Sequence, residues 1–385
     1  MSKKTAYTQV PGANPPMKSI INRRQILKKG VAVAAFAGGR SAALTAAQTP
    51  TAVQFPDRIR VGIIGLEGHY SEILEATKLV PQVQISAIAE KSEDLLRRVP
   101  RTALLKRAKV YGDYRELLDR EKLDVVAVCG ENGMRAAIIQ ACAARKVPIV
   151  AEKPLALTLG ELDQVRSAIT AAKVPLTMLL PMRFDPRYRR MRAVVGSGEI
   201  GEVVMLAAQK SYKLGSRPEW MKNKASYGGT IPYIGIHMVD LMLFVGGRDF
   251  KSVAGFQSRV GFPEMRDMEN NAVVVFQLDN HGSASLRLDY LRPQSAPSHG
   301  DDRLRIAGTE GIIEHQEVTG LMSTTSKQGP QPVTDLPPTK LLFVDFLESL
   351  YGKTKHALSL NEIFRVNEIV LKAREAAETG RVIAL

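Results

Sequence analysis

Short apolar runs alternate with longer amphipathic segments in the first half of the chain. The apolar runs occupy residues 60–65, 83–89, 108–111, 123–129, 148–151 and 175–180. The segments between them carry apolar residues at helical spacing and span 69–80, 91–107, 114–121, 134–146 and 158–173. Strands that alternate with helices in this way are typical of a parallel sheet covered on both faces. The pattern therefore predicts a doubly wound α/β domain over residues 58–180.

From residue 181 onward the pattern changes to shorter strands separated by turn residues. Strand-like segments, several of them alternating, begin near residues 203, 251, 271, 282 and 302. Helical spacing returns near 185–196, 234–245 and 340–351. The final segment, LNEIFRVNEIVLKAREAAETG, predicts a helix that ends at Gly380. Residues 181–385 are therefore expected to form an α+β domain around a mixed or antiparallel sheet.

The basic character of the chain is concentrated at its N-terminus. The first 50 residues hold eight of the 53 lysines and arginines and no acidic residue, so without them the formal net charge falls from +14 to +6. Such a segment indicates targeting rather than binding to nucleic acid, and we expect no nucleic-acid partner.

The N-terminal segment has the order of an export signal. NRRQILKKG, residues 22–30, is followed by VAVAAFAGG and then by small residues from 41 to 47. The apolar stretch is about half of the roughly 20 residues that a membrane span requires. The segment resembles a twin-arginine signal, with Asn22 and Ile26 where Ser and Phe are usual. A disordered basic tail is the alternative.

We therefore predict a signal peptide over residues 1–47, cleaved after Ala43 or Ala47, and a linker over 48–57. Its expected partner is the twin-arginine translocase, and the expected location is the periplasm or another extracytoplasmic space. This route carries folded proteins, often with a bound cofactor. The two cysteines, Cys129 and Cys142, lie in apolar surroundings and are expected to be buried thiols without a disulfide framework.

The stretch RVGIIGLEGHYSEIL, residues 60–74, joins the first predicted strand to the first helix. In a doubly wound sheet this turn binds a pyrophosphate, because one glycine permits the tight turn and a second lets the backbone approach closely. Gly65 fills the first glycine position, whereas Glu67 and Tyr70 occupy the next two and Gly68 lies between them. A carboxylate at Glu67 is unfavourable there unless its side chain turns to solvent. The stretch predicts a degenerate dinucleotide loop that still binds.

Glu90 strengthens the prediction of a dinucleotide site. It ends the second strand, 25 residues after Gly65, close to the spacing expected of a carboxylate that accepts from a ribose diol. Lys91 beside it would instead favour a 2′-phosphate, so NAD and NADP both remain candidates. His69 is placed either to donate to a phosphate or to lie on the surface.

Two later motifs carry candidate chemistry. Glu152, Lys153 and Pro154 follow the fifth strand, at the carboxyl end where ligands of such folds bind. YGGTIPYIGIHMVDLMLF, residues 227–244, places His237 and Asp240 about one turn apart on a helix. An idle surface lysine and a buried core histidine are the structural alternatives.

These motifs resemble the glucose-fructose oxidoreductase, inositol dehydrogenase and biliverdin reductase-like family, written Gfo/Idh/MocA. The resemblance covers residues 58–385. The segments that carry it are VGIIG, YGDYRELLDREKLDVVAV, AEKPLALT, RFDPRYRRMRAVVGSGEIGEV, YGGTIPYIGIHMVDL, RLRIAGTEGIIE and REAAETGRV. It implies a Rossmann domain, a second domain with an open mixed sheet, and a crevice for a nicotinamide cofactor and a sugar or polyol. It also implies a homodimer or homotetramer formed through the open sheets.

The resemblance assigns the catalytic group. Lys153 and His237 match the family's lysine and histidine, but Tyr233 replaces the aspartate that lies four residues before the histidine. His237 would be the base that removes the hydroxyl proton, and Lys153 would stabilise the developing alkoxide. Tyr233 is neutral near pH 7 and would orient by hydrogen bonding or act as an acid.

The remaining site residues follow from the same comparison. Asn132 is kept after the fourth strand, whereas Arg135 stands where the family has a histidine. The expected cofactor residues are Gly65, Leu66, Glu67, Gly68, Glu90, Lys91, Asn132, Glu152 and Lys153. The expected substrate residues are Arg183, Lys210, Tyr212, Arg217, Trp220 and Asp240. No metal site is expected.

The leading interpretation is an exported NAD(P)-dependent sugar or polyol oxidoreductase that holds its cofactor tightly. A redox-neutral lyase or glycosidase, in which the cofactor oxidises a sugar carbon transiently, is one alternative, and Tyr233 would suit it as acid or base. A sugar-binding relic without catalysis is the other. Glu67 and the missing aspartate favour the relic, whereas Lys153 and His237 oppose it.

Overall fold

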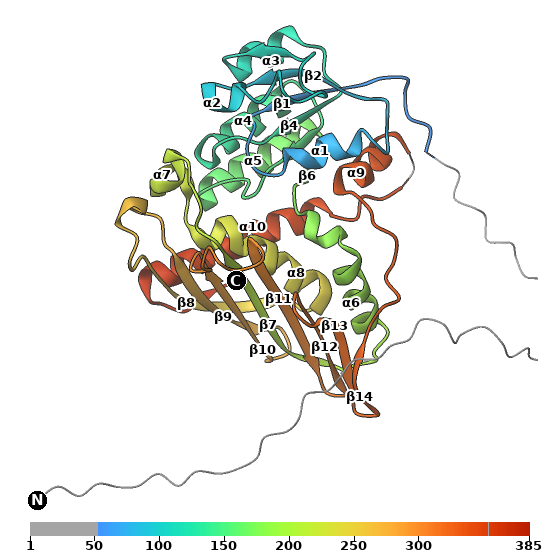
Figure 1. The fold of residues 1–385 in the computed structure, drawn as a ribbon, viewed down its shortest axis with the longest axis vertical. Coiled ribbons are helices and arrows are strands. Elements are labelled where there is room, and N and C mark those ends of the chain that lie inside the picture. Colours follow the sequence, from blue (N-terminus) through green and yellow to red (C-terminus); the bar gives the residue numbers. More distant parts are fainter. Residues whose placement is uncertain (1–52, 353) are drawn as a thin grey trace, which may run out of the picture. The chain divides into compact units, whose positions relative to one another are not determined.

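The computed structural model describes residues 53–352 and 354–385. The predicted signal peptide, residues 1–47, and the first half of the predicted linker, residues 48–52, lie outside the described residues. The described residues belong to a single structural unit that contains two β-sheets (Figure 1).

The first sheet has six parallel strands in the order β3-β2-β1-β4-β5-β6. Its strands are β1 (Ile59–Ile64), β2 (Val83–Ala89), β3 (Lys109–Tyr111), β4 (Val125–Val128), β5 (Ile149–Ala151) and β6 (Leu176–Met178). All four residues of β4 and all three of β5 are buried, as strands covered on both faces must be. The sheet confirms the predicted doubly wound domain, and its strand order reverses between β1 and β4.

Five helices connect these strands. They are α1 (Tyr70–Ala76), α2 (Glu93–Leu96), α3 (Tyr114–Arg120), α4 (Asn132–Ala144) and α5 (Leu159–Ala172). The helix expected over 91–107 is wrong in length, because only α2 is helical there and turns follow it. Pro100 explains the difference, since it lacks the N–H that a helix interior needs and disfavours helical geometry at the residue before it. Cys129 and Cys142 are free and buried, as predicted.

The second sheet is mixed, as predicted, and has the order β14-β13-β12-β11-β7-β10-β9-β8-β15. Its strands are β7 (Val203–Tyr212), β8 (Phe250–Ser258), β9 (Asn271–Leu278), β10 (Ser283–Asp289), β11 (Gly300–Gly308), β12 (Gly311–Gln316), β13 (Gly320–Thr325), β14 (Gln328–Pro332) and β15 (Ile383–Ala384). Strands β7 and β10 run parallel, and the other pairs are antiparallel. The sequence pattern missed β13, β14 and β15, of which β14 is fully exposed and β15 is two residues long.

Helices cover one face of this second sheet (Figure 1). The covering helices are α6 (Pro186–Gly196), α8 (Ile236–Gly246) and α10 (Leu360–Thr379), which contact β12, β7 and β8 respectively. Strand β9 shows the consequence, because Val274 and Phe276 are buried while Val273 and Val275 on the opposite face are about half exposed. The second face of the sheet is therefore open in this chain.

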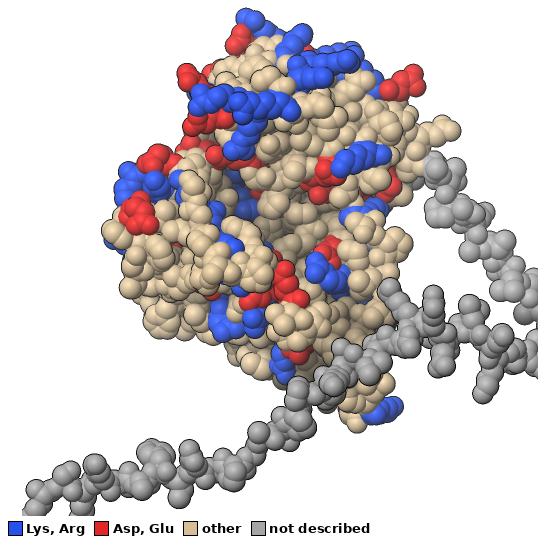
Figure 2. Space-filling view, in the orientation of Figure 1, with Lys and Arg blue, Asp and Glu red and all other residues tan. Residues whose placement is uncertain are grey.

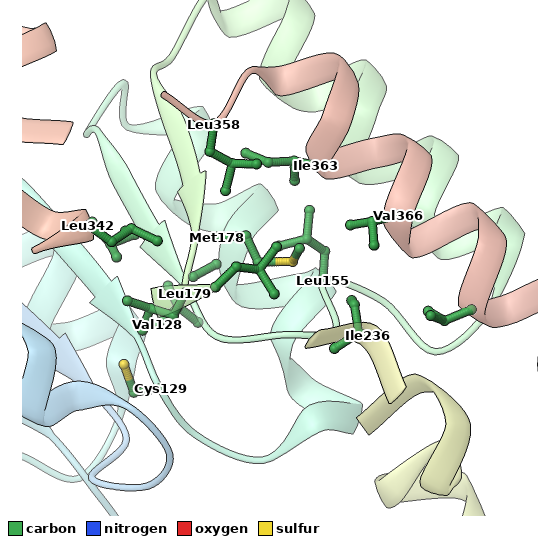
Figure 3. Close-up of a cluster of buried hydrophobic side chains, with 14 of the residues drawn as sticks. Val128, Cys129, Leu155, Met178, Leu179, Ile236, Leu342, Leu358, Ile363 and Val366 are labelled. Atoms are coloured by element: carbon green, nitrogen blue, oxygen red, sulfur yellow. The ribbon is translucent and has the colours of Figure 1, made fainter. Parts of the chain in front are cut away.

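Helix α10 packs against both sheets, since it contacts β6 and β8, whereas helix α9 (Leu342–Tyr351) contacts α1. Figure 3 shows Leu358, Ile363 and Val366 beside Met178 and Leu179 at the end of β6. A capping box formed by Ser359 and Glu362 starts α10 immediately before these contacts.

The segment Lys224–Gly246 contains α7 (Lys224–Tyr227), a π-helical turn η3 (Ile231–Gly235) and α8. Among the described residues it is the one helical segment long and apolar enough to cross a membrane, but 83% of the apolar window is buried inside the protein. It therefore has the features of a core helix. π-turns are frequent at functional sites, and this one contains Tyr233, four residues before His237.

Candidate active site

The loop after β1 requires glycine at its first position. Gly65 has a φ of +85°, and a Cβ built there would lie 2.3 Å from the Cα of Gly130. This contact brings the loops after β1 and β4 together at the carboxyl edge of the sheet, where the strand order reverses. Ligands of doubly wound folds bind at such a point. Gly130 lies two residues before Asn132, but the sequence analysis did not single it out.

Glu90 lies beside this loop and faces its backbone. Its carboxylate accepts from the backbone N–H groups of Leu66 (2.9 Å), Lys91 (2.8 Å) and Ser92 (2.8 Å). These bonds fix the carboxylate at the end of β2. The Lys91 side chain is exposed.

A cavity of about 450 Å³ opens at this edge of the sheet. Its lining residues include Gly65, Glu67, Glu90, Lys91, Tyr114 and Trp220. It has the size of a small-molecule pocket, roughly 300–1,000 Å³. The glycine turn and the fixed carboxylate fit the phosphates and ribose of a dinucleotide.

Glu67, at the second glycine position, does not turn to solvent. Its side chain is half-buried and accepts a hydrogen bond of 2.7 Å from the indole Nε1 of Trp220, which belongs to the second domain. Burial raises the pKa of Glu67, and the bond from Trp220 opposes that shift. The unusual loop carboxylate therefore links the first domain to the second across the cofactor cavity.

Gly68 makes room for Glu152. A Cβ at Gly68 would lie 2.3 Å from Glu152 Oε1. That oxygen also bonds Nδ1 of His69 at 2.7 Å and accepts from the His69 backbone N–H. Burial would raise the pKa of Glu152, but the charges and hydrogen bonds of His69 and the charge of Lys153 lower it to about 2. The ionised carboxylate holds the glycine loop against the Glu-Lys-Pro turn.

Lys153 is buried at the carboxyl end of β5, followed by a cis Lys153-Pro154 bond. Its Nζ donates to the backbone carbonyl of Tyr233 at 2.8 Å and lies 3.6 Å from the centroid of the Tyr233 ring. Burial lowers the pKa of Lys153 to about 7, although the charge of Glu152 opposes this shift. Near pH 7 the amine can therefore either hold or accept a proton.

His237 lies in the first turn of α8 and is buried. Its ring packs edge-to-face on the ring of His69, with centroids 5.3 Å apart, and its Nδ1 has no hydrogen-bond partner among the described residues. Burial and the charges of Lys153 and Lys210 lower the pKa of His237 well below 6.5. The imidazole is therefore neutral at pH 7, and it is a weak base.

Tyr233 places a neutral aromatic ring against Lys153, where the family has an ionised carboxylate. Its ring packs on the rings of Tyr227 and Trp220, with centroids 5.1 and 6.1 Å away. Burial raises the pKa of its phenol, so it stays neutral. The carboxylate that would raise the pKa of a neighbouring histidine is therefore replaced by a neutral ring.

Asn132 and Arg135 both lie on α4, where Asn132 bonds to the second domain and Arg135 bonds within the first. Asn132 Nδ2 donates to the backbone carbonyl of Tyr227 at 2.7 Å, and its Oδ1 has no partner among the described residues. Arg135 donates to the carbonyls of Pro154 (2.8 Å) and Gly130 (2.6 Å) and is buried. Arg135 thus supports the Glu-Lys-Pro turn from below.

Two of the expected substrate residues bond each other instead. Arg183 donates through Nε to Asp240 Oδ2 at 3.2 Å and through Nη1 to Glu362 at 2.6 Å, and both Arg183 and Asp240 are buried. The guanidinium thus pairs with two carboxylates. A substrate role for Arg183 and Asp240 is therefore not supported by their placement, and the pair joins α8 to the start of α10.

The other expected substrate residues lie on the second domain's side of the crevice. Lys210 and Tyr212 both lie at the end of β7. Lys210 Nζ donates to Asp302 at 2.7 Å and lies 5.0 Å from the centroid of the Tyr212 ring. The guanidinium of Arg217 stacks on the ring of Tyr290 at 4.7 Å. The space-filling view shows the surface hollowed between the two domains, with both basic and acidic side chains around the hollow (Figure 2). Tyr290 was missed from sequence because no motif surrounds it.

Comparison with known proteins agrees with this architecture. Residues 59–179 match a family model described as an oxidoreductase family with an NAD-binding Rossmann fold. Residues 188–314 match the Gfo/Idh/MocA C-terminal domain. A solved oxidoreductase structure from Thermotoga maritima is 33% identical, covers 85% of this chain and 100% of its own, and superposes with a TM-score of 0.80. The chain belongs to the Gfo/Idh/MocA oxidoreductase family.

Two inositol dehydrogenases are more distant relatives. Myo-inositol 2-dehydrogenase of Thermotoga maritima is 26% identical over 51% of this chain and 57% of its own length. Inositol 2-dehydrogenase 2 of Saccharopolyspora erythraea is 26% identical over 58% of this chain and 64% of its own length. The match thus spans less than two thirds of either relative.

Proposed function

We propose that this protein is an NAD-dependent dehydrogenase of a neutral sugar or polyol. The observation that carries the proposal is the placement of Lys153, whose pKa is lowered to about 7 and whose charge lowers the pKa of His237, at the strand edge that also bears the dinucleotide-type cavity. Family membership and the inositol dehydrogenases among its relatives support the substrate class. Accumulation of NADH from NAD and a panel of sugars and polyols, starting with myo-inositol, tests it.

This proposal moves the base role that the sequence predicted for His237 to Lys153. Proton acceptors work best when their pKa lies near the working pH. Lys153 meets that condition in its neutral form, whereas the pKa of His237 is too low. We therefore assign proton removal from the substrate hydroxyl to Lys153, and orientation of that hydroxyl to His237. A bound nicotinamide would accept the hydride.

Gly65, Glu90 and the 450 Å³ cavity would hold the cofactor. The fixed Glu90 carboxylate suits the two ribose hydroxyls of NAD and repels a 2′-phosphate. Glu90→Ala is expected to weaken NAD binding about 10-fold and to narrow the preference for NAD over NADP, because the lost interactions are one or two charge-assisted hydrogen bonds. Equilibrium dialysis with both nucleotides measures this. Lys91→Ala is the matched control, and a larger effect of Lys91→Ala on NADP would argue for a phosphate site instead.

Replacing Tyr233 by the family's aspartate is expected to raise the pKa of Lys153, because an added carboxylate favours the protonated amine. The Lys153 amine must be neutral to accept the substrate proton, and with a raised pKa it becomes neutral only at higher pH. The rise of kcat/KM with pH in Tyr233→Asp should therefore move at least one pH unit above its position in the wild type. Tyr233→Asn removes the same ring without adding a charge and should not produce this shift. Equal profiles for both variants would contradict the role given to Lys153.

Export and assembly complete the proposal. The basic N-terminal segment supports passage through the twin-arginine translocase, which would deliver the folded protein with its cofactor. The open face of the second sheet exposes Phe256, Val273, Val275 and Met205, an apolar surface that suits pairing with a second copy. Cell fractionation and light scattering of the purified protein test these two points.

A further inference from the structure

Glu67 occupies the second glycine position of the loop after β1, where the backbone of a doubly wound fold approaches the pyrophosphate. A carboxylate that faced the phosphates would repel them. Its Oε2 instead accepts a hydrogen bond of 2.7 Å from the indole Nε1 of Trp220. Hydrogen bonds to a carboxylate are stronger than those between neutral groups, so this bond is a firm link between residues 153 positions apart.

The bond between Glu67 and Trp220 forms part of the wall of the 450 Å³ cofactor cavity, because both residues line that cavity. Within the described part of the chain, Trp220 is the only lining residue that belongs to the second domain. It lies on a short 3-10 turn, η2 (Glu219–Lys222). The glycine loop of the first domain therefore holds this turn of the second domain at the cavity through the Glu67 carboxylate.

Trp220 also lies next to the catalytic groups. Its ring meets the ring of Tyr233 edge to face, with the centroids 6.1 Å apart. The Tyr233 ring in turn lies 3.6 Å from Nζ of Lys153. Trp220 thus adjoins the cavity on one side and the ring under Lys153 on the other. A dinucleotide whose adenosine ribose is held at Glu90 would place its nicotinamide half against Trp220.

The contact with Glu67 fixes how the indole is oriented. An aromatic side chain adds to the binding of a flat ring only in certain orientations, because such rings stack with an offset or meet edge to face. The Trp220 side chain is partly exposed and its turn is only four residues long, so the surrounding chain holds it weakly. The bond at Nε1 stops the indole from rotating. It also satisfies the carboxylate, which accounts for a glutamate at a position that favours glycine.

We propose that Glu67 is a positioning residue, whose carboxylate fixes the indole of Trp220 against the nicotinamide half of the bound dinucleotide. The proposal rests on the proposed NAD-dependent function and deepens it. The departure of the loop from the glycine pattern then serves cofactor binding and is not the mark of a relic that has lost its cofactor.

Comparing NAD with ADP isolates this role. ADP has the adenosine and the two phosphates of NAD but no nicotinamide, so a change in the fold of the loop or in its charge near the phosphates alters both affinities alike. The measured quantity is the ratio of the Kd of ADP to the Kd of NAD, obtained by equilibrium dialysis. Glu67→Leu has a similar size and cannot accept a hydrogen bond, whereas Glu67→Gln removes the charge and keeps an acceptor oxygen.

Glu67→Leu is expected to lower this ratio about fivefold, because it loses one hydrogen bond that orients the indole. Glu67→Gln should keep the ratio within about twofold of the wild-type value, because its amide oxygen still accepts from Nε1. Trp220→Leu should lower the ratio at least as much as Glu67→Leu, and the double variant should lower it no further, since the two residues act through one contact.

Three results would overturn the proposal. They are an unchanged ratio in Glu67→Leu, equal losses in Glu67→Leu and Glu67→Gln, and losses that add in the double variant. The first would mean that Glu67 acts on the phosphates alone, the second that its charge matters rather than its contact with the indole, and the third that Glu67 and Trp220 act independently.

The positioning role and the proposed function can fail separately, because sugar oxidation does not enter this experiment. If the ratios change as expected but no sugar yields NADH, the role of Glu67 is supported and the dehydrogenase proposal fails. If sugars yield NADH but Glu67→Leu leaves the ratio unchanged, only the positioning role fails. A wild-type protein that binds ADP and NAD equally well, or that binds neither, also overturns the positioning role.

Discussion

Lys153→Met is expected to lower kcat/KM by roughly 10³-fold, within the range that general acid–base groups contribute, while leaving NAD binding nearly intact. Methionine matches the length and apolar stem of lysine but cannot take a proton. The cofactor cavity is lined by other residues, so the nucleotide should still bind. Steady-state kinetics and equilibrium dialysis on the same preparation measure the two effects.

The pH dependence identifies what Lys153 does. Because burial lowers its pKa to about 7, the neutral amine becomes available as pH rises through neutrality, and kcat/KM should rise with it. Lys153→Arg keeps a permanent charge and cannot accept a proton. It should be as inactive as Lys153→Met if the lysine is a base, and partly active if the lysine only stabilises an alkoxide. A rise well below pH 6.5 that disappears in His237→Asn would return the base role to His237.

The sequence predicted the first domain well because its signals are local. Five of the six apolar runs coincide with strands β1, β2, β4, β5 and β6, and the weaker run at 108–111 coincides with β3. The helix expected over 91–107 is interrupted for a local reason too, since Pro100 disfavours helical geometry at the residue before it. In the second domain, β14 carries Gly and two Pro in an exposed edge and shows no alternation.

The candidate site was less predictable because its decisive contacts join distant parts of the chain. The motifs around Lys153 and His237 are local and identified both residues. The contact of Glu67 with Trp220 spans 153 residues, and that of Lys153 with the Tyr233 carbonyl spans 80. No sequence spacing indicates such pairs. The same holds for Gly130, whose role depends on how closely the backbone of Gly65 approaches.

The pairing of Arg183 with Asp240 leads to the second large expected effect. Asp240→Asn should destabilise the folded protein by about 3–5 kcal/mol, because it leaves a buried guanidinium without the charge that compensates its desolvation. Both side chains are about 2% exposed, so water cannot replace the lost carboxylate. Urea denaturation followed by circular dichroism measures the change in the free energy of unfolding.

Glu362→Gln is the matched control, since Glu362 bonds the same arginine but its side chain is 44% exposed. An exposed partner is worth about 0–1 kcal/mol, and glutamine can preserve the capping box with Ser359. The Asp240→Asn protein that remains folded at low temperature should retain its KM for sugar, because the Asp240 carboxylate is paired with Arg183 and does not contact the substrate. A raised KM without loss of stability would instead place Asp240 at the substrate. The two measurements together therefore separate a residue that builds the crevice from one that binds within it.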